Sequence, residues 1–443
     1  MISRLTSLQR LADIVDKLVD ERVGVIESVI EAERKYGAPD IFCFVARACN
    51  TKALGGVRNF SDAGGASTDR TIALAKAIGE AVERYCAAIY DATDLPFCSY
   101  DDAPFCCVPP FRFALYSSEQ YQADGFPYRP FSNQTLVRWT PAVTLSNSER
   151  CYVPASMVFL PYYYRPESGE PPIAQPISTG LACHSSLEEA AIAGICEVIE
   201  RDAVMITWQA KLAVPHIIVD SLSERNRDLI NRFEQARFSV SLFDVTMDHG
   251  ISTILSILLG TVDELPALLM AAATHLDPEE AVRKSLEELA LTQRAAQRLQ
   301  RIMPPIRPDI SFSNITSQDC HLRFFCDHNN VSLADFLFAS QRWVDFHELP
   351  NLSTGDPVQD LQVLLQKISC LNHDILLSDI TTPDIKELGL SVIRALIPGF
   401  HPLFFGHRLR ALAGSRLWEV PQKLGYPGIT RESGDNPVPH PYP

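Results

Sequence analysis

The chain has 443 residues, of which 46% are hydrophobic and 21% are charged. This balance is typical of a folded globular protein and excludes a disordered or fibrous chain. The net charge of −15 disfavours nucleic acid as a partner, because an acidic surface repels a phosphate backbone. The twelve cysteines are scattered and form no CxxC pair, so we expect reduced thiols and neither a zinc ribbon nor a disulfide scaffold.

The N-terminal segment carries no secretory signal. Leucines recur at helical spacing from Leu5 to Leu18, but Asp13 and Asp16 interrupt any continuous apolar run. No stretch elsewhere is apolar and long enough to cross a membrane. We therefore expect an amphipathic helix over residues 1–35 and a soluble, cytoplasmic protein.

Alternating helix and strand patterns follow along the rest of the chain. Residues 41–47 predict a strand, the glycines at 55, 56, 64 and 65 predict a loop, and residues 67–90 predict a helix. Residues 95–130, rich in proline and aromatic residues, predict irregular structure with edge strands. Further strands are expected within 135–160 and at 215–219, 238–245, 250–260, 266–274 and 389–397, with helices at 186–209 and 278–302. No linker divides the chain, which predicts one interlocked α+β unit.

Two of the predicted helices carry the same ExxER motif. Its members are Glu80, Glu83 and Arg84 in the first helix and Glu197, Glu200 and Arg201 in the second. Residues i and i+3 share one face of a helix, so the two glutamates of each motif project together. Their like charges repel unless a cation lies between them, and Mg²⁺ prefers carboxylate oxygens and shares its shell with substrate phosphates. The repeat indicates an internal duplication.

Glu189 extends the second motif. It precedes Glu200 by eleven residues, which places it about 20° away around the helix. Glu189 also fits a capping box with Ser186, so a purely structural role stays open. A single ExxER is usually a solvated ion pair, but two such helices, each with apolar residues around the glutamates, favour a buried site.

Common catalytic motifs are absent from the sequence. It contains no GxxxxGK[ST], GxGxxG, HExxH or GxSxG pattern. The P-loop, Rossmann, zincin and hydrolase classes therefore lose support. What remains is a metal–phosphate site built from helix carboxylates.

An ordered series of residues resembles the signature of the YcaO family. The series runs from Gly64 through Lys76 and the first ExxER motif, and resumes at 178–182 before Glu189 and the second motif. Residues 279–294 are similar to the third block of that family. The resemblance implies an α+β, YcaO-type fold in which ATP and Mg²⁺ bind between the duplicated ExxER helices.

The resemblance also implies roles for particular residues. The nucleotide-binding set would be Lys76, Glu80, Glu83, Arg84, Ser185, Glu189, Glu197, Glu200, Arg201 and Arg283. The five glutamates among them would coordinate Mg²⁺, and Arg283 would meet phosphate oxygens. Ser185, His184 and Thr179 depart from the residues usual in the family, which puts the second nucleotide loop in question but spares every carboxylate.

Prolines alternate through the end of the chain, at 437, 439, 441 and 443. Alternating proline makes a stiff, extended tail, although chain ends are commonly disordered. A proline-ended tail resembles that of azoline-forming members of the family. The resemblance implies that the tail reaches the active site and that a carboxylate at Pro443 acts there as a base.

The implied activity is ATP-dependent cyclodehydration of Cys, Ser or Thr in a ribosomally made precursor peptide. Phosphorylation of the backbone amide oxygen would give a thiazoline or oxazoline. Two alternatives stay open, namely a YcaO enzyme that forms thioamides or amidines and a non-catalytic scaffold subunit.

The expected organisation is an N-terminal helix and strand region at 1–60, a YcaO catalytic domain at 61–430 and a tail at 431–443. Because the chain begins almost directly with the family region, we expect a leader-binding E1-like or ThiF-like partner protein. A flavin (FMN)-dependent dehydrogenase is a further expected member of a hetero-oligomeric complex.

Overall fold

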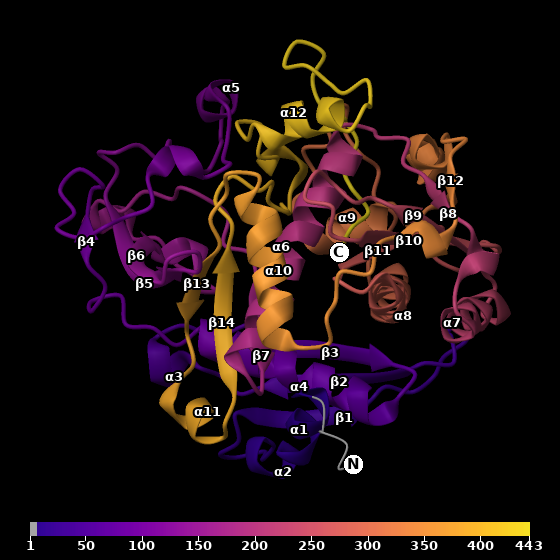
Figure 1. The fold of residues 1–443 in the computed structure, drawn as a ribbon, viewed down its shortest axis with the longest axis horizontal. Coiled ribbons are helices and arrows are strands. Elements are labelled where there is room, and N and C mark those ends of the chain that lie inside the picture. Colours follow the sequence, from indigo (N-terminus) through magenta and orange to yellow (C-terminus); the bar gives the residue numbers. More distant parts are fainter. Residues whose placement is uncertain (1–6) are drawn as a thin grey trace.

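The computed structural model describes residues 7–443, and in that part three β-sheets surround two helices that carry the repeated motif (Figure 1). The first sheet has the order β1–β2–β3 and the second the order β11–β10–β9–β8–β12. The third has the order β4–β5–β13–β14–β7, with β6 paired to β5. The α+β prediction is confirmed.

The strands of the first sheet are β1 (Ile26–Glu31), β2 (Phe42–Ala48) and β3 (Asp62–Ser67). Those of the second sheet are β8 (His216–Ile217), β9 (Phe238–Asp244), β10 (Thr253–Gly260), β11 (Leu268–Thr274) and β12 (Trp343–Val344). Those of the third are β4 (Phe97–Cys98), β5 (Val137–Thr144), β6 (Glu149–Pro154), β7 (Leu181–His184), β13 (Leu376–Asp379) and β14 (Ser391–Leu396). All strands predicted from the sequence are present, with shorter bounds in several cases.

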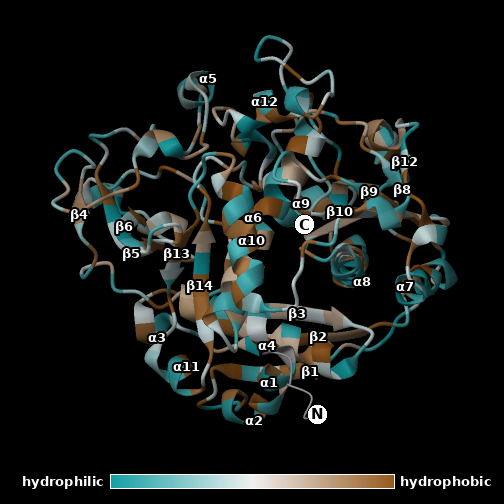
Figure 2. Cartoon of the chain, viewed as in Figure 1, coloured by the Kyte–Doolittle hydropathy of each residue, from teal (hydrophilic) through white to brown (hydrophobic). Residues whose placement is uncertain are grey.

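The long helices are α4 (Arg70–Ala87), α6 (Leu187–Gln209), α7 (Glu224–Gln235), α8 (Pro278–Ile302) and α10 (Pro357–Ser369). Shorter helices are α1 (Ser7–Asp13), α2 (Val15–Leu18), α3 (Lys52–Gly55), α5 (Ser118–Gln122), α9 (Gln318–Phe324), α11 (Pro383–Glu387) and α12 (Arg416–Lys423). Hydrophilic residues cover α7 and much of α8, whereas hydrophobic residues line the interior (Figure 2).

The prediction of one helix over residues 1–35 is wrong in the described part. Helix ends at Leu18, and the second half of this segment forms β1. A turn separates the two, in which the Asp20 carboxylate accepts the backbone N–H groups of Arg22 and Val23. Gly24 closes this turn, because a Cβ there would lie 2.3 Å from the Asp20 nitrogen. Residues 1–6, including Leu5, lie outside the described residues.

Gly64 and Gly65 lie inside β3, so the prediction of a loop there is wrong. A Cβ at position 65 would lie 2.1 Å from the carbonyl oxygen of Ala73 and 2.4 Å from the nitrogen of Ala77. Glycine is therefore required for close approach of the strand to α4, and not for a turn. This contact holds α4 directly against the strand.

Strand β7 lies between the two motif helices and contacts both. Helix α4 begins at its N-cap Asp69, whose side chain accepts two backbone N–H groups, and α6 begins at Ser186. Helix α6 is buried on most sides, and it packs on β14, β11 and α10. Helix α8 lies over β10 and β11 and reaches β3, which brings a third helix to the same region.

Candidate functional site

The first glutamates of the two ExxER motifs make equivalent hydrogen bonds. Glu80 accepts the Gly64 backbone N–H at 2.6 Å and pairs with Arg84 at 2.5 Å. In the second helix, Glu197 accepts the Gly180 backbone N–H at 3.0 Å and pairs with Arg201 at 3.1 Å. In each half, then, the first glutamate bridges its own helix to a glycine that lies before the helix. This correspondence supports the internal duplication that the sequence indicates.

Of the second glutamates of the two motifs, Glu83 is half-buried and Glu200 is buried. Glu83 accepts the backbone N–H of Cys183 in β7 at 2.8 Å. Burial raises its pKa well above the ordinary value, and the charges of Glu80 and Glu197 add to this rise. The charges of carboxylates from both halves of the duplication therefore act on Glu83. The two motifs lie at one site.

Glu200 is only 9% exposed. Burial raises its pKa to about 7, although the Arg201 charge opposes this effect. Glu288 from α8 is more exposed but lies near the same group, because partial desolvation followed by the charge of Glu80 raises its pKa. Three helices thus bring carboxylates together in a setting where ionised carboxylates repel.

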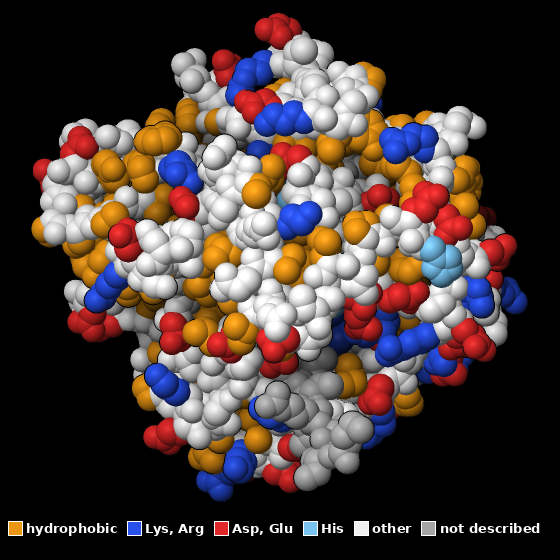
Figure 3. All heavy atoms as spheres, viewed as in Figure 1, with side chains coloured by type: hydrophobic (Ala, Val, Ile, Leu, Met, Phe, Trp, Pro, Cys, Tyr) orange, Lys and Arg blue, Asp and Glu red, His pale blue; other side chains and the backbone are white. Residues whose placement is uncertain are grey.

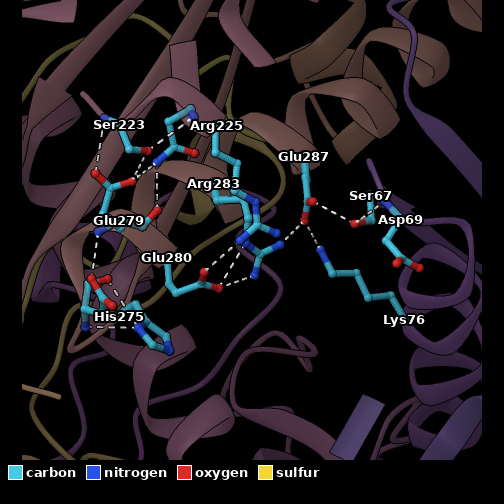
Figure 4. A network of polar contacts seen from close by, with 12 residues as sticks. Ser67, Asp69, Lys76, Ser223, Arg225, His275, Glu279, Glu280, Arg283 and Glu287 are labelled. Atoms are coloured by element: carbon cyan, nitrogen blue, oxygen red, sulfur yellow. Dashed lines mark hydrogen bonds and ion pairs between the residues drawn. The ribbon is translucent and has the colours of Figure 1, made fainter. Parts of the chain in front are cut away.

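Basic side chains from α4 and α8 lie near this group, since the charge of Lys76 acts on Glu288. Glu287, which is fully buried, lies between Lys76 at 2.6 Å and Arg283 at 2.5 Å (Figure 4). Its pKa is lowered, because these two cations outweigh the effect of burial. Ser67 at the end of β3 donates to the same carboxylate at 2.8 Å. The bonds to Glu287 therefore tie β3, α4 and α8 into one unit.

Lys284 adds a further cation to this basic region. Burial lowers its pKa, and the charges of Lys76 and Arg283 lower it further. Arg283 also pairs with Glu280, one turn earlier in α8. In the space-filling view, basic and acidic side chains gather over the surface between α8 and β3 (Figure 3). A cluster of repelling cations beside a cluster of repelling carboxylates can hold phosphate and a divalent metal together.

The C-terminal tail is buried against the second motif helix. The Tyr442 hydroxyl donates to Glu200 at 2.5 Å and contacts Arg201, whose guanidinium lies 4.8 Å from the Tyr442 ring centroid. Upstream, the Trp208 indole donates to the Val438 carbonyl at 2.9 Å. Tyr442 is 1% exposed. The tail is therefore a packed part of the site.

Histidines hold the middle of the tail in place. A ring nitrogen of His440 lies 2.9 Å from the Phe404 carbonyl oxygen, and a ring nitrogen of His321 lies 2.9 Å from the His440 carbonyl oxygen. The two imidazoles stack, with their ring centroids 4.1 Å apart. Pro443 follows and is half-buried. Its role as a base stays a prediction.

The residues predicted for the site do not all converge. Glu80, Glu83, Glu197 and Glu200 meet, and Lys76 and Arg283 lie together beside them. Glu189 instead accepts a hydrogen bond from the Ser186 hydroxyl at 3.0 Å at the start of α6, and its own backbone N–H donates to the same Ser186 oxygen, which caps the helix. Ser185 lines a separate cavity with Arg10 and Leu388. The metal-binding roles of the glutamates and the nucleotide-binding roles of the other residues stay predictions.

The donor set fits Mg²⁺ in its chemistry, since it consists of crowded carboxylate oxygens whose protonation a divalent cation would oppose. Among residues 7–443, no group of three or more His, Cys, Asp or Glu side chains already stands as a metal site. Arg84 and Arg201 occupy carboxylate oxygens of the two motifs. Metal binding would require these glutamates to exchange partners.

Glu287, Glu288 and Lys284 were not singled out from the sequence, although they stand in its third block. Their spacing in 280–288 repeats acidic and basic residues at three- and four-residue intervals, which is the signal that places them on one helix face. Tyr442 was also missed, because nothing in a proline-rich end identifies which side chain is buried.

The family profile described as YcaO cyclodehydratase, ATP- and Mg²⁺-binding, matches residues 64–401. Among curated proteins, an uncharacterized protein of Methanothermobacter thermautotrophicus is 29% identical over 362 residues, covering 78% of this chain and 85% of that protein. The prediction of ATP and Mg²⁺ as cofactors agrees with the description of the family.

Solved structures share the fold. A heterocyclase in complex with substrate and cofactor matches 98% of this chain with a TM-score of 0.79 and 20% identity. The chain spans 57% of that heterocyclase. The YcaO protein of Methanopyrus kandleri, bound with AMPPCP and Mg²⁺, has a TM-score of 0.64 and 19% identity over 90% of this chain and 92% of its own. A chain of the E. coli microcin synthetase McbBCD complex with bound pro-MccB17 has a TM-score of 0.59 and 14% identity over 93% of this chain and 96% of its own.

The described residues contain no helix with the length and apolar character that a membrane crossing needs. The family match covers most of the chain and includes both ExxER helices, β7 and α8. The chain therefore belongs to the YcaO family, which is described as ATP- and Mg²⁺-binding cyclodehydratases.

Proposed function

We propose that the chain is an ATP-dependent cyclodehydratase that forms thiazoline or oxazoline rings in a ribosomally made precursor peptide. One observation carries this proposal. Four buried or half-buried glutamates come from two equivalent helices, Glu288 links them to the Lys and Arg side chains of α4 and α8, and the tail ends against one of the glutamates. Carboxylates, cations and a buried phenol in one site suit phosphoryl transfer to a bound substrate.

The side chains divide between two tasks. Glu80, Glu83, Glu197 and Glu200 would hold Mg²⁺, and Lys76 and Arg283 would bind the phosphates of ATP. When bound, ATP with Mg²⁺ supplies a phosphoryl group and neutralises the charge on it during transfer. Glu287 keeps Lys76 and Arg283 a fixed distance apart, since both pair with the same oxygen.

The proposed reaction begins when the thiol or hydroxyl of a Cys, Ser or Thr of the peptide gives up its proton and its sulfur or oxygen adds to the preceding carbonyl carbon. The former carbonyl oxygen then takes the phosphoryl group, so that ADP is released. Loss of the amide proton and departure of phosphate from the same carbon complete the C=N bond of the ring. The net change is loss of water from the peptide and hydrolysis of ATP to ADP and phosphate.

The tail would orient groups at this step. Tyr442 fixes the Glu200 carboxylate and Arg201 through its hydroxyl and its ring. A carboxylate at Pro443 would lie within one residue of these contacts, from where it could accept the amide proton. Removing the last two residues tests both roles together.

The proposed partners are the precursor peptide, an E1-like or ThiF-like protein that captures its leader, and an FMN-dependent dehydrogenase. Support comes from the likeness to McbBCD, which the description of that structure presents as a complex with a bound pro-peptide. A partner that holds the leader would raise the rate through proximity.

Reconstitution tests the proposed function. The purified chain, a short Cys/Ser-rich precursor peptide from a neighbouring gene and the encoded partner are combined with ATP and Mg²⁺. The expected result is loss of one water per ring by mass spectrometry together with phosphate release. Thioamide or amidine products from sulfide or an amine would establish the alternative, and no ATP turnover in the complete mixture would establish the scaffold.

A further inference from the structure

A cavity of about 140 Å³ lies beside the second motif helix, outside the carboxylate site. Its walls are mainly apolar and aromatic and come from at least five separate stretches of chain. The residues that matter here are Met157, Ala174, Thr179, Val198, Arg394 and His401, which all line it. Apolar cavities with a few converging polar groups are the usual form of a small-ligand or side-chain site.

Arg394 in β14 is 5% exposed and lacks a full set of partners. One terminal nitrogen donates to the Ile177 carbonyl at 2.6 Å, but Nε and the other terminal nitrogen have no partner within the described protein. Burial lowers its pKa to about 10, with Glu197 opposing the shift. A buried guanidinium that lacks hydrogen-bond acceptors is costly, so an acceptor from outside the chain would be strongly favoured.

His401 supplies the complementary group. One ring nitrogen lies 2.6 Å from the Gln209 side-chain oxygen, and the amide nitrogen of Gln209 donates to Asp435 at 3.0 Å. This chain of bonds fixes the Nε2 proton on His401, because burial lowers its pKa to about 3 and keeps the ring neutral. Its Nδ1 is then a buried acceptor with no partner in the described protein, as is the Thr179 hydroxyl, which can donate or accept.

The cavity adjoins the carboxylate site through the backbone. Thr179 directly precedes Gly180, whose N–H binds Glu197, and Val198 follows Glu197 on α6. The charge of Glu197 also acts on Arg394. Glu197 therefore already supplies a negative charge near Arg394. What is missing is a neutral acceptor for the Arg394 N–H groups and a donor for His401 Nδ1.

We propose that this cavity binds the segment of the substrate peptide next to the modified residue, with an apolar side chain inside it, a backbone carbonyl on Arg394 and a backbone N–H on His401. A peptide unit offers one acceptor and one donor and carries no charge, which matches the unpaired groups. The identification of the occupant as substrate rests on the proposed function. The cavity would favour substrates with an aliphatic residue beside the ring-forming one.

The test uses N-acetyl-leucine N-methylamide as the probe and the chain labelled with ¹³C at its methionine methyl groups. The probe carries an isobutyl side chain between two peptide units. The Met157 resonance is expected to shift saturably, whereas that of Met270, buried in another part of the core, stays in place. N-acetyl-glycine N-methylamide, which lacks the side chain, is expected to bind several-fold more weakly.

Replacement of Arg394 by Met should weaken probe binding about tenfold, since bonds to a charged group are lost. The matched control is Arg112→Met, because Arg112 pairs with Asp374 near the surface and should leave binding unchanged. If Arg394→Met does not fold, Ala174→Leu fills the cavity and should abolish the shift. An unmoved Met157 resonance in the wild-type chain, or equal binding by Arg394→Met, would overturn the proposal.

The probe assay needs no ATP, so it separates this inference from the proposed function. Probe binding without any peptide modification in the complete mixture would overturn the function and keep the cavity as a peptide site. If the chain modifies a precursor but its cavity does not bind the probe, the cavity proposal is overturned and the proposed function is kept. Equal shifts from both probes would mean that the cavity does not select for an aliphatic side chain.

Discussion

The two halves of the duplication keep the same first glutamate and differ at the second. Glu80 and Glu197 each bind a glycine N–H and the arginine of their own motif. Glu83, however, accepts a backbone N–H from β7, whereas Glu200 accepts the Tyr442 hydroxyl and pairs with Arg201. The second glutamate therefore contacts a strand in the first half and the C-terminal tail in the second half.

The halves also differ four residues before the first glutamate. Lys76 stands there in α4 and reaches Glu287 of α8, whereas the equivalent residue in α6 is Ala193. The first half therefore contributes to the basic region, while the second half faces the tail and the Arg394 cavity. This asymmetry fits a proposed division in which α4 with α8 binds phosphates and α6 binds the peptide.

The largest effect is expected from removing the second glutamate of either half. Glu83→Gln or Glu200→Gln should lower nucleotide turnover by roughly 10²–10³-fold, because each removes a charge from the proposed metal site. Phosphate release with Mg·ATP in the reconstituted complex is the measurement. The matched control is Glu234→Gln on the exposed face of α7, which should behave as wild type. Wild-type turnover in both site variants would rule out the site.

The next prediction concerns the tail, which contacts only the second half. Deleting Tyr442 and Pro443 should reduce ring formation by at least about tenfold, since the bonds to Glu200 and Arg201 disappear. Binding of an ATP analogue should persist, because the basic region lies on α4 and α8. Tyr442→Phe keeps the ring and removes only the hydroxyl, so its effect should be smaller. Ring formation at the normal rate after deletion would leave the tail with no role beyond packing.

Much of the architecture could be predicted because the patterns are local. The helices at 67–90, 186–209 and 278–302 have long apolar periodicity, and the ExxER spacing fixes which glutamates share a face. Gly65 was misplaced because a glycine required for helix approach looks the same in sequence as a turn glycine. Glu288 and Tyr442 depend on contacts between distant segments, and no local pattern encodes such contacts.

A third prediction compares the two motif arginines in stability. Arg201 is four-fifths buried between Glu197, Glu200 and Tyr442, so Arg201→Met should lower the free energy of unfolding by about 3 kcal/mol. The Arg84–Glu80 pair is about one third exposed, and Arg84→Met should cost about 1 kcal/mol. Urea unfolding of both variants measures the difference. Equal losses would show that the tail adds nothing to the second half.

The smallest effect is expected at Glu189, the predicted ligand whose carboxylate is engaged at the start of its own helix. Its carboxylate accepts the Ser186 hydroxyl at 3.0 Å and its backbone N–H donates to the Ser186 oxygen at 3.2 Å, so a capping role accounts for its position. Glu189→Gln keeps this hydrogen bond and removes only the charge. Among the five glutamates it should therefore reduce nucleotide turnover least, whereas Ser186→Ala should lower the free energy of unfolding by about 1 kcal/mol. A loss of turnover in Glu189→Gln as large as that in Glu200→Gln would instead mean that Glu189 leaves its cap to bind the metal, and that the second half supplies one more ligand than the first.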